Sequence, residues 1–275
     1  VLGVGVSVPG QVDRDTGVSE YAPNWDWHDV PLLALLSEVI AYPLYLDNPL
    51  RAGAVAEMWF GAARGRGDTV VVNLGTGVGA GLALHGGLYR GVSNSAGEWG
   101  HTTLVLDGRL CRCGNHGCVE AYVGAPGIML NLRELSPRSP MLHPEDQTAT
   151  IDALARGVEA NDPVALKVVR ETARYIGACL PNLVNVLNPE VVVLSSWVAR
   201  RLGEPLLHEV REAVGRHALR RPFAATEIVL SPIPTDPACL GAATFALEGA
   251  LQSVGQRGAS AKRTTPARSR TAPPS

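Results

Sequence analysis

Short, Val-rich apolar runs alternate along the chain with longer segments in which apolar residues recur every three or four positions. The runs have the length and β-branched content of buried strands, and the longer segments have the period of helices packed on one face. Strands are predicted within residues 1–13, 44–46, 68–91, 189–196 and 226–233. Helices are predicted within residues 29–42, 48–65, 162–188, 202–219 and 239–251. This alternation indicates an α/β protein.

The longest predicted helix, residues 162–188, carries a single apolar stripe. The spacing predicts that this stripe faces the core: Val168, Val169, Ala173, Ile176, Leu180 and Leu183. Residues 252–275, in contrast, are rich in Pro, Ser, Arg and Thr and have no such period. We expect a disordered, solvated tail there, with nucleic-acid binding as the alternative role.

Composition narrows the class of protein. The 275 residues are 46% apolar with a net charge of −2, which gives no overall attraction to nucleic acid or anionic lipid. No apolar run approaches the roughly 20 residues of a membrane span. We therefore expect a cytoplasmic protein, in which structural disulfides are uncommon. The chain opens at Val1 inside a predicted strand, which we interpret as truncation at the N-terminus.

Three of the five cysteines lie within eight residues of one another, and a histidine precedes the first by ten. Cys111 and Cys113 are too close in sequence to form a disulfide easily. Thiolates and imidazole are the donors that zinc prefers, and four of them leave no open position. The pattern predicts a structural zinc site, with a loop of free thiols as the alternative. Its ligands would be His101, Cys111, Cys113 and Cys118.

Two glycines of the cysteine segment and the two remaining cysteines have simpler predicted roles. Gly114 and Gly117 supply the permissive backbone with which a short loop can wrap a metal. Cys179 and Cys239 lie in apolar predicted helices, so we expect them to be core residues.

The segment from Glu98 to Glu120 resembles the signature of the ROK family (repressor, open reading frame, kinase). It follows the family pattern ExGH…CxCGxxGCxE in both residues and spacing. Other segments resemble the family in the family's order: VPGQVD, APNWDWHDVPL, the helix ending in AVAE, NLGTGVGAG and LGAA. The resemblance implies a two-lobed actin-like ATPase or sugar-kinase (ribonuclease H-like) fold with a zinc-binding loop. It also implies a bacterial sugar kinase or a sugar-responsive transcriptional repressor.

The resemblance assigns roles to residues as well. It implies the same four zinc ligands, and sugar hydroxyls bound by Asn48, Glu98, His101 and Glu120. Carboxylates and an imidazole held rigid by a metal form well-oriented hydrogen bonds to a polyol. Solvated loop acids are the alternative for the two glutamates. The two tryptophans of APNWDW line the cleft or, as the alternative, pack locally.

The glycine loop in NLGTGVGAG follows a Val-rich strand, so its backbone N–H groups could cradle a phosphate. By resemblance, Gly75, Thr76 and Gly77 match the loop that touches nucleotide phosphates in the family's kinases. The signal is weak alone because no P-loop Lys-Ser/Thr follows. We favour a structural role, in which the hairpin needs the backbone angles of glycine.

A sugar kinase needs a carboxylate beside the attacking hydroxyl. Alignment of AVAE with the family's ENDAN…AE segment places Pro49 where the catalytic Asp stands. Proline cannot accept a proton. Asp47 is a weak candidate for the base, because a shift of two residues around a rigid proline would aim it elsewhere.

Two further phosphate-handling elements differ from the family. The segment after the late strand reads VVVLSSWVARR, so Ser195, Ser196 and Trp197 add bulk where the family's glycines admit a nucleotide. The Asp-x-Gly-x-Thr motif expected before residue 1 is absent, which truncation explains equally well. The elements that contact sugar are kept while those that handle phosphate are lost, as expected of a sugar sensor.

We therefore expect a sugar-sensing effector domain of a ROK-type transcriptional regulator, which binds a hexose or amino sugar without phosphorylating it. The alternatives are a glucokinase-like hexose kinase, which would use ATP and Mg²⁺, and a fragment that retains zinc but no function. DNA would be bound only through a missing N-terminal helix-turn-helix, and the family implies a homodimer or tetramer. The predicted small lobe comprises residues 1–46 and 236–251, and the large lobe comprises 47–235 with the zinc loop at 98–120.

Overall fold

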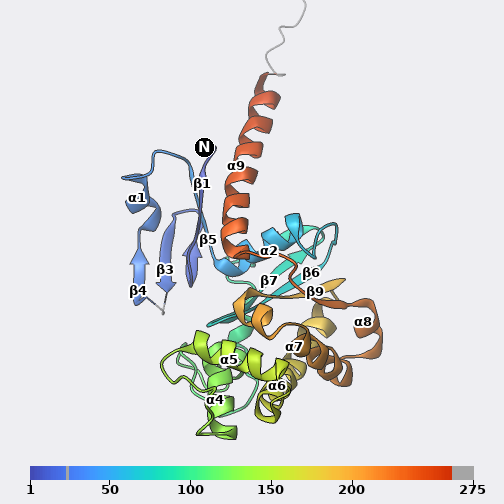
Figure 1. Ribbon diagram of the computed structural model, residues 1–275. Helices are drawn as coiled ribbons and strands as arrows, with labels where there is room; N and C mark the ends of the chain where they lie inside the picture. The colour runs from blue at the N-terminus through green and yellow to red at the C-terminus, as the bar shows by residue number, and fades with distance from the viewer. Residues whose placement is uncertain (23–24, 262–275) are drawn as a thin grey trace, which may run out of the picture.

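The computed structural model describes residues 1–22 and 25–261. Its strands form one five-stranded sheet and two smaller sheets. Figure 1 shows a group of short strands beside helix α9, and a larger unit of sheet and helices below them. Within the described residues, no helix is both long enough and apolar enough to cross a membrane.

The five-stranded sheet has the order β10-β9-β6-β7-β8. Its strands are β6 (Thr69–Leu74), β7 (Val78–Leu84), β8 (Gly87–Tyr89), β9 (Val191–Ser195) and β10 (Glu227–Leu230). β6, β9 and β10 are parallel, whereas β7 and β8 are antiparallel to their neighbours. β9 is buried at every position, as expected for a central strand that is covered on both faces.

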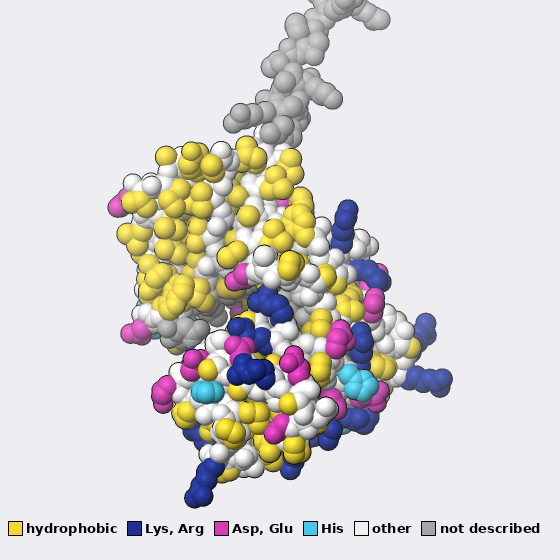
Figure 2. Space-filling view, viewed as in Figure 1, with side chains coloured by type: hydrophobic (Ala, Val, Ile, Leu, Met, Phe, Trp, Pro, Cys, Tyr) yellow, Lys and Arg dark blue, Asp and Glu magenta, His cyan; other side chains and the backbone are white. Residues whose placement is uncertain are grey.

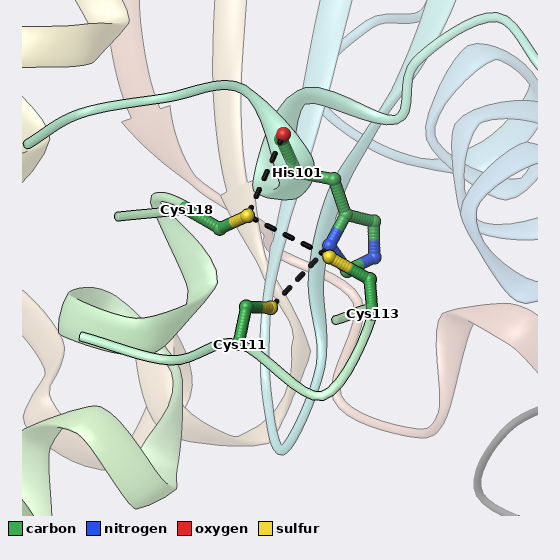
Figure 3. Close-up of side chains that lie close together, drawn as sticks. All are labelled: His101, Cys111, Cys113 and Cys118. Atoms are coloured by element: carbon green, nitrogen blue, oxygen red, sulfur yellow. Dashed lines mark hydrogen bonds between the residues drawn. The ribbon is translucent and has the colours of Figure 1, made fainter. Parts of the chain in front are cut away.

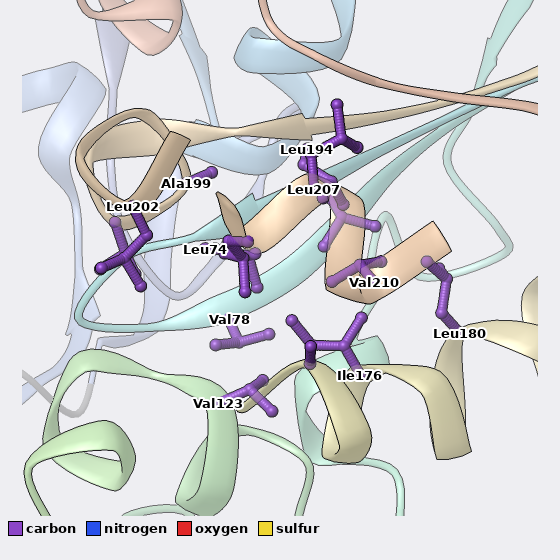
Figure 4. Packing of buried hydrophobic residues seen from close by; sticks show 14 of the residues in the cluster. Leu74, Val78, Val123, Ile176, Leu180, Leu194, Ala199, Leu202, Leu207 and Val210 are labelled. Atoms are coloured by element: carbon purple, nitrogen blue, oxygen red, sulfur yellow. The ribbon is translucent and has the colours of Figure 1, made fainter. Parts of the chain in front are cut away.

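Alternate residues of β6 and β9 face two different layers. Val192 and Leu194 belong to the main core, together with residues of α6 and α7 (Figure 4). Val191 and Val193 instead pack with Ala54 of α2 (Pro49–Phe60). The period of two in the strand therefore separates the two layers of the fold.

Helices α3 to α8 belong to the large unit; in Figure 1, α4, α5, α6 and α7 lie below the sheet and α8 lies to its right. Their bounds are α3 (Glu120–Val123), α4 (Ala125–Leu135), α5 (Gln147–Glu159), α6 (Pro163–Leu187), α7 (Ser196–His217) and α8 (Arg220–Ala225). Asp162 caps α6 by accepting hydrogen bonds from the N–H groups of Val164 and Ala165. Five residues of the predicted α6 stripe are buried and the sixth, Leu183, is half-buried, which confirms the stripe.

The short strands form the small unit. β1 (Val4–Ser7) pairs in parallel with β5 (Leu44–Asp47), and β2 (Gln11–Asp13), β3 (Val18–Ala22) and β4 (Trp27–Val30) form an antiparallel sheet beside α1 (Leu32–Ser37). Helix α9 (Pro237–Ala261) packs on β1 and crosses α2. A Cβ on Gly241 would lie 1.7 Å from the carbonyl oxygen of Ala52, so only glycine permits this crossing.

The helix boundaries correct several predictions. α2 ends at Phe60 rather than at the predicted Gly65, because Gly61 leaves helical geometry beside the Glu57 carboxylate. α7 begins at Ser196 but is broken at Gly203, which has a non-helical φ of +54°. The predicted helix 202–219 corresponds to the part after this break, and the short part before it was missed. The predicted tail is wrong for residues 252–261, where α9 continues; no proline interrupts this stretch, and a packed first half supports its propagation. The rest of the tail lies outside the described residues.

Some local elements were missed because their apolar patterns are short or weak. These are β3, β4, α3, α4, α5 and α8. Cys179 is buried, as predicted, but Cys239 is exposed near the start of α9, so its assignment to the core was wrong.

Candidate sugar-binding cavity and metal centre

The predicted metal ligands converge on one point. His101 comes from the 3₁₀ helix η1 (Trp99–His101), and the three cysteines come from the loop that leads into α3. All four donor atoms lie within 4.8 Å of one another (Figure 3).

The spacing of these donors fits zinc. The Sγ atoms of Cys113 and Cys118 are 3.7 Å apart, and Cys111 Sγ lies 3.7 Å from His101 Nδ1. Tetrahedral zinc with bonds of about 2.3 Å to sulfur places two sulfurs roughly 3.8 Å apart. Burial raises the pKa of the Cys118 thiol to about 12 and also raises that of Cys111. A cation is therefore needed to hold these groups as thiolates at neutral pH.

The backbone of the cysteine loop depends on the two glycines singled out in the sequence. Gly114 and Gly117 have φ values of +89° and +76°, in the left-handed region that favours glycine. A Cβ on Gly117 would also lie 1.7 Å from the carbonyl oxygen of Val105. Both observations support the prediction that the loop wraps a metal only with glycine at these places.

A cavity of about 330 Å³ lies beside this cluster, between the small unit and the five-stranded sheet. Both units contribute to its wall: Pro9, Gly10, Gln11, Tyr21, Ala22, Asn48, Pro49, Leu50, Asn73, Gly77, Val78, Glu98, His101, Arg112, Cys113 and Glu120. The four residues predicted to bind sugar are all among them. Trp25 and Trp27 are not; they pack against each other with ring centroids 4.8 Å apart.

The two cavity glutamates differ in their surroundings. Glu120 Oε2 accepts a hydrogen bond of 2.9 Å from the N–H of Val78, and Oε1 lies 3.8 Å from Cys111 Sγ. Glu120 therefore joins the glycine loop to the metal cluster. Burial raises the pKa of Glu98, although positive charge on His101 and Arg51 opposes this shift.

Asn48 and Pro49 form the entry to α2. The Asn48 side chain caps the helix by accepting from the N–H of Leu50 at 2.8 Å, and its amide donates to the Gly10 carbonyl oxygen at 2.6 Å. Pro49 occupies the first helical position, where its missing N–H is not needed. Its ring, not a carboxylate, lines the cavity.

The Asp47 carboxylate is enclosed by cations instead of facing the cavity. Its side chain is 1% exposed. It accepts hydrogen bonds from Arg51 Nε at 2.7 Å, from Arg90 Nη1, and from the N–H of Asn48. Asp47 is not among the cavity-lining residues.

The glycine loop is shaped by close contacts. Gly75 and Gly77 do not have positive φ, so the prediction that the hairpin needs special backbone angles was wrong for them. A Cβ on Gly75 would lie 3.1 Å from Ser196 Oγ and 3.2 Å from Trp197 Nε1, and one on Gly77 would lie 3.3 Å from Glu120 Oε2. Thr76 donates to Gln147 on α5. Only Gly77 of these three reaches the cavity.

Ser196 and Trp197 thus lie directly against the loop that was matched to phosphate binding. Ser196 has a φ of +79°, a conformation that serine rarely adopts. Trp197 is held in place by Arg201, whose guanidinium lies 5.2 Å from the indole centroid.

Sequence reasoning missed Asn73, Arg90 and the small-unit residues of the wall. Asn73 was visible as the one polar residue inside the run VVVNL. The pairing of Asp47 with Arg51 was also readable, since the two lie four positions apart across a helix start. Nothing local marks Arg90, which reaches Asp47 from the residue directly after the edge strand β8.

Comparisons with known proteins agree with this arrangement. A family model described as the ROK family matches residues 1–248. A glucokinase of Halalkalibacterium halodurans is 33% identical over 251 residues, covering 88% of this chain and 74% of that protein. A xylose repressor of Caldicellulosiruptor bescii is 29% identical over 259 residues, covering 91% of this chain and 64% of the repressor. The chain therefore spans less than two thirds of that repressor.

Among solved structures, a ROK family glucokinase from Streptomyces griseus, in complex with glucose and AMPPNP, superposes with a TM-score of 0.81. The identity is 28%, over 90% of this chain and 81% of that one. The relatives thus include kinases and repressors alike.

Proposed function

Because the chain belongs to the ROK family, we propose that it is the sugar-sensing part of a transcriptional regulator and binds a hexose or amino sugar without phosphorylating it. The observation that carries the proposal is the environment of Asp47 and Pro49. Pro49 lines the cavity at the place of the expected base, and the aspartate nearest to it in sequence, Asp47, is buried beneath two arginines. A carboxylate held in this way is poorly placed to take a proton from a sugar hydroxyl.

The nucleotide side supports the same reading. Ser196 Oγ and Trp197 Nε1 lie 3.1 and 3.2 Å from the position of a Cβ on Gly75, so little room is left for a phosphate chain on that side of the loop. Close backbone approach to phosphates normally requires that such space be open. The positive φ of Ser196 adds local strain that the surrounding packing must maintain.

The sugar side, in contrast, is complete in its chemistry. Asn48, Glu98, His101 and Glu120 bring amide, carboxylate and imidazole groups to one cavity, and the cluster of three cysteines and His101 can fix its wall through zinc. Bound zinc would supply rigidity to this wall, and no open coordination position is needed.

As a sensor, the protein would respond to sugar through the cleft between its two units. We assign residues 1–46 and 236–251 to a small lobe and residues 47–235 to a large lobe. Sugar that contacts both lobes would favour the closed arrangement, and the lobe angle would be passed to a DNA-binding helix-turn-helix outside residues 1–275. Self-association as a dimer or tetramer, in the cytoplasm, is part of this proposal.

The second candidate is an ATP-dependent hexose kinase, favoured by the 33% identity to a glucokinase and by the retained residues Gly75, Thr76 and Gly77. A coupled assay of ADP release with Mg-ATP and a panel of hexoses and N-acetylhexosamines separates the two. The sensor predicts no sugar-dependent ADP release. Turnover that disappears in Asp47→Asn or Glu98→Gln, while sugar binding is kept, would establish the kinase and identify its base.

A further inference from the structure

One wall of the cavity comes from the small unit and is held by side chains that lie outside it. This wall segment, residues 9–12, contributes Pro9, Gly10 and Gln11 to the cavity lining. The amide of Asn48 donates to the Gly10 carbonyl oxygen at 2.6 Å, and the amide of Asn94 donates to the Val12 carbonyl oxygen at 3.0 Å. Both anchors are single side-chain hydrogen bonds over long sequence distances.

Asn94 is itself held by a cation from the large unit. Arg90, directly after β8, uses Nη1 to donate both to Asn94 Oδ1 at 3.0 Å and to Asp47 Oδ2. Its guanidinium lies 5.7 Å from the ring centroid of Phe245 on α9. One guanidinium thus contacts strand β5, the loop that carries Asn94, and α9.

The buried Asp47 carboxylate anchors Arg90 and, through it, Asn94. Arg51, which is 1% exposed, orients its carboxylate from one side, so the second oxygen is directed at Arg90. Because the pair is buried, the carboxylate has little freedom to move away. The chain Asp47–Arg90–Asn94 therefore fixes the wall segment relative to the start of α2, which lies beside it in the cavity wall.

We propose that Arg90 and Asn94 are positioning residues for the ligand of the cavity. They clamp the wall segment of the small unit against the large unit, and so hold the two walls at binding distance. The proposal rests on the proposed sugar binding but is the same for a sensor and for a kinase. By reciprocity, sugar that touches both walls stabilises the clamp as much as the clamp stabilises bound sugar.

The cleanest test removes only the Asn94 side chain. Asn94 has a φ of +53°, so Asn94→Gly keeps the backbone conformation and deletes the amide. Asn161, exposed at the end of α5 with a φ of +57°, provides the matched control, Asn161→Gly. Two quantities are measured: hydrogen exchange of the peptide spanning residues 8–13, and affinity for the best-binding sugar of a hexose panel by calorimetry.

We expect faster exchange of that peptide in Asn94→Gly and an affinity about fivefold lower, as for the loss of one hydrogen bond. Asn161→Gly should match the unmodified protein in both. Arg90→Met, like Asn94→Gly, should speed hydrogen exchange of that peptide and lower the sugar affinity. Arg90→Lys should retain part of the affinity, because its ammonium can still pair with Asp47, although its more flexible side chain holds Asn94 less firmly than the planar guanidinium does.

If the peptide spanning residues 8–13 exchanges hydrogen at the same rate in Asn94→Gly and Asn161→Gly, the clamp is overturned, whatever the sugar affinity. Faster exchange with unchanged affinity would overturn its role in ligand binding. If the unmodified protein binds no sugar of the panel, the proposed function fails separately, and the exchange result still decides whether the clamp exists.

Discussion

Asp47 Oδ1 accepts a hydrogen bond from Arg51 Nε at 2.7 Å, and both side chains are 1% exposed. A charged pair buried this completely is part of the folded structure, and removal of one partner leaves the other charge uncompensated. Asp47→Asn should therefore lower the free energy of unfolding by about 3–5 kcal/mol, measured by urea denaturation. The exposed Asp15→Asn serves as control and should change little. A catalytic base in open contact with the cavity would instead tolerate the change with little loss of stability.

Zinc binding should be stoichiometric and structural. The purified protein should contain one zinc per chain, and chelation should lower the Tm by at least about 5 °C, because metal binding contributes to folding. Sugar affinity should fall with it, since His101 and Glu120 border both sites. Measurement of the metal content of the purified protein, and of its thermal unfolding with and without a chelator, tests the zinc stoichiometry and the loss of Tm.

Cys118→Ser and Cys239→Ser form a matched pair for that prediction. Cys118 is buried in the cluster, whereas Cys239 is exposed on α9. Only Cys118→Ser should lose zinc. Retention of a full equivalent of zinc in this variant would contradict the assigned ligands.

Glu57 should make stability depend on pH. Its side chain is fully buried, Oε2 accepts from the N–H of Ala62 at 2.9 Å, and the other oxygen accepts from the hydroxyl of Ser231. Burial raises the pKa of Glu57 above its ordinary value of 4.5. The folded state therefore binds this proton more tightly than the unfolded state.

It follows that the contribution of Glu57 to stability is fully present below pH 4.5 and is lost as the pH rises through the raised, folded-state pKa. Glu57→Gln cannot titrate; its amide oxygen can accept from the N–H of Ala62, and its NH2 group would donate to the Ser231 hydroxyl oxygen instead of accepting from it. The difference in unfolding free energy, native Glu minus Gln, should decline over that window, as measured by urea denaturation at a series of pH values. Parallel curves for the two proteins would show that Glu57 is not responsible.

Pro49→Asp should restore a carboxylate to the cavity without creating a kinase. Asp is well tolerated at the first position of a helix, so the fold should be kept. Ser196 and Trp197 would still lie against Gly75, where the phosphates are expected. No sugar-dependent ADP release should appear above that of Pro49→Ala. Clear turnover in Pro49→Asp alone would show that the nucleotide side is not obstructed.

The sequence predicted those features of the fold and of the site that depend on a characteristic spacing of residues along the chain. The cysteines and His101 could be grouped because zinc ligands have a recognisable pattern, and Gly114 and Gly117 because a tight loop needs left-handed backbone. The α6 stripe followed from helical period alone. The reason for Gly75 could not be read in this way, because its neighbours Ser196 and Trp197 lie at the start of α7, more than a hundred residues later in the chain.

The same limit explains what was missed in the cavity. Arg90 and Asn94 act on Asp47 and Val12 across two units, and no spacing in the chain encodes that contact. The continuation of α9 past residue 251 was hidden by a polar composition, since propagation of a packed helix does not require an apolar face.

The central claim is that this chain binds a sugar and leaves it unphosphorylated. The most direct measurement incubates the zinc-loaded protein with Mg-ATP and the sugar that calorimetry shows to bind best, and then quantifies sugar phosphate by ³¹P NMR. The account predicts saturable binding and no sugar phosphate above a protein-free sample. Sugar phosphate that accumulates with time and in proportion to protein would contradict it.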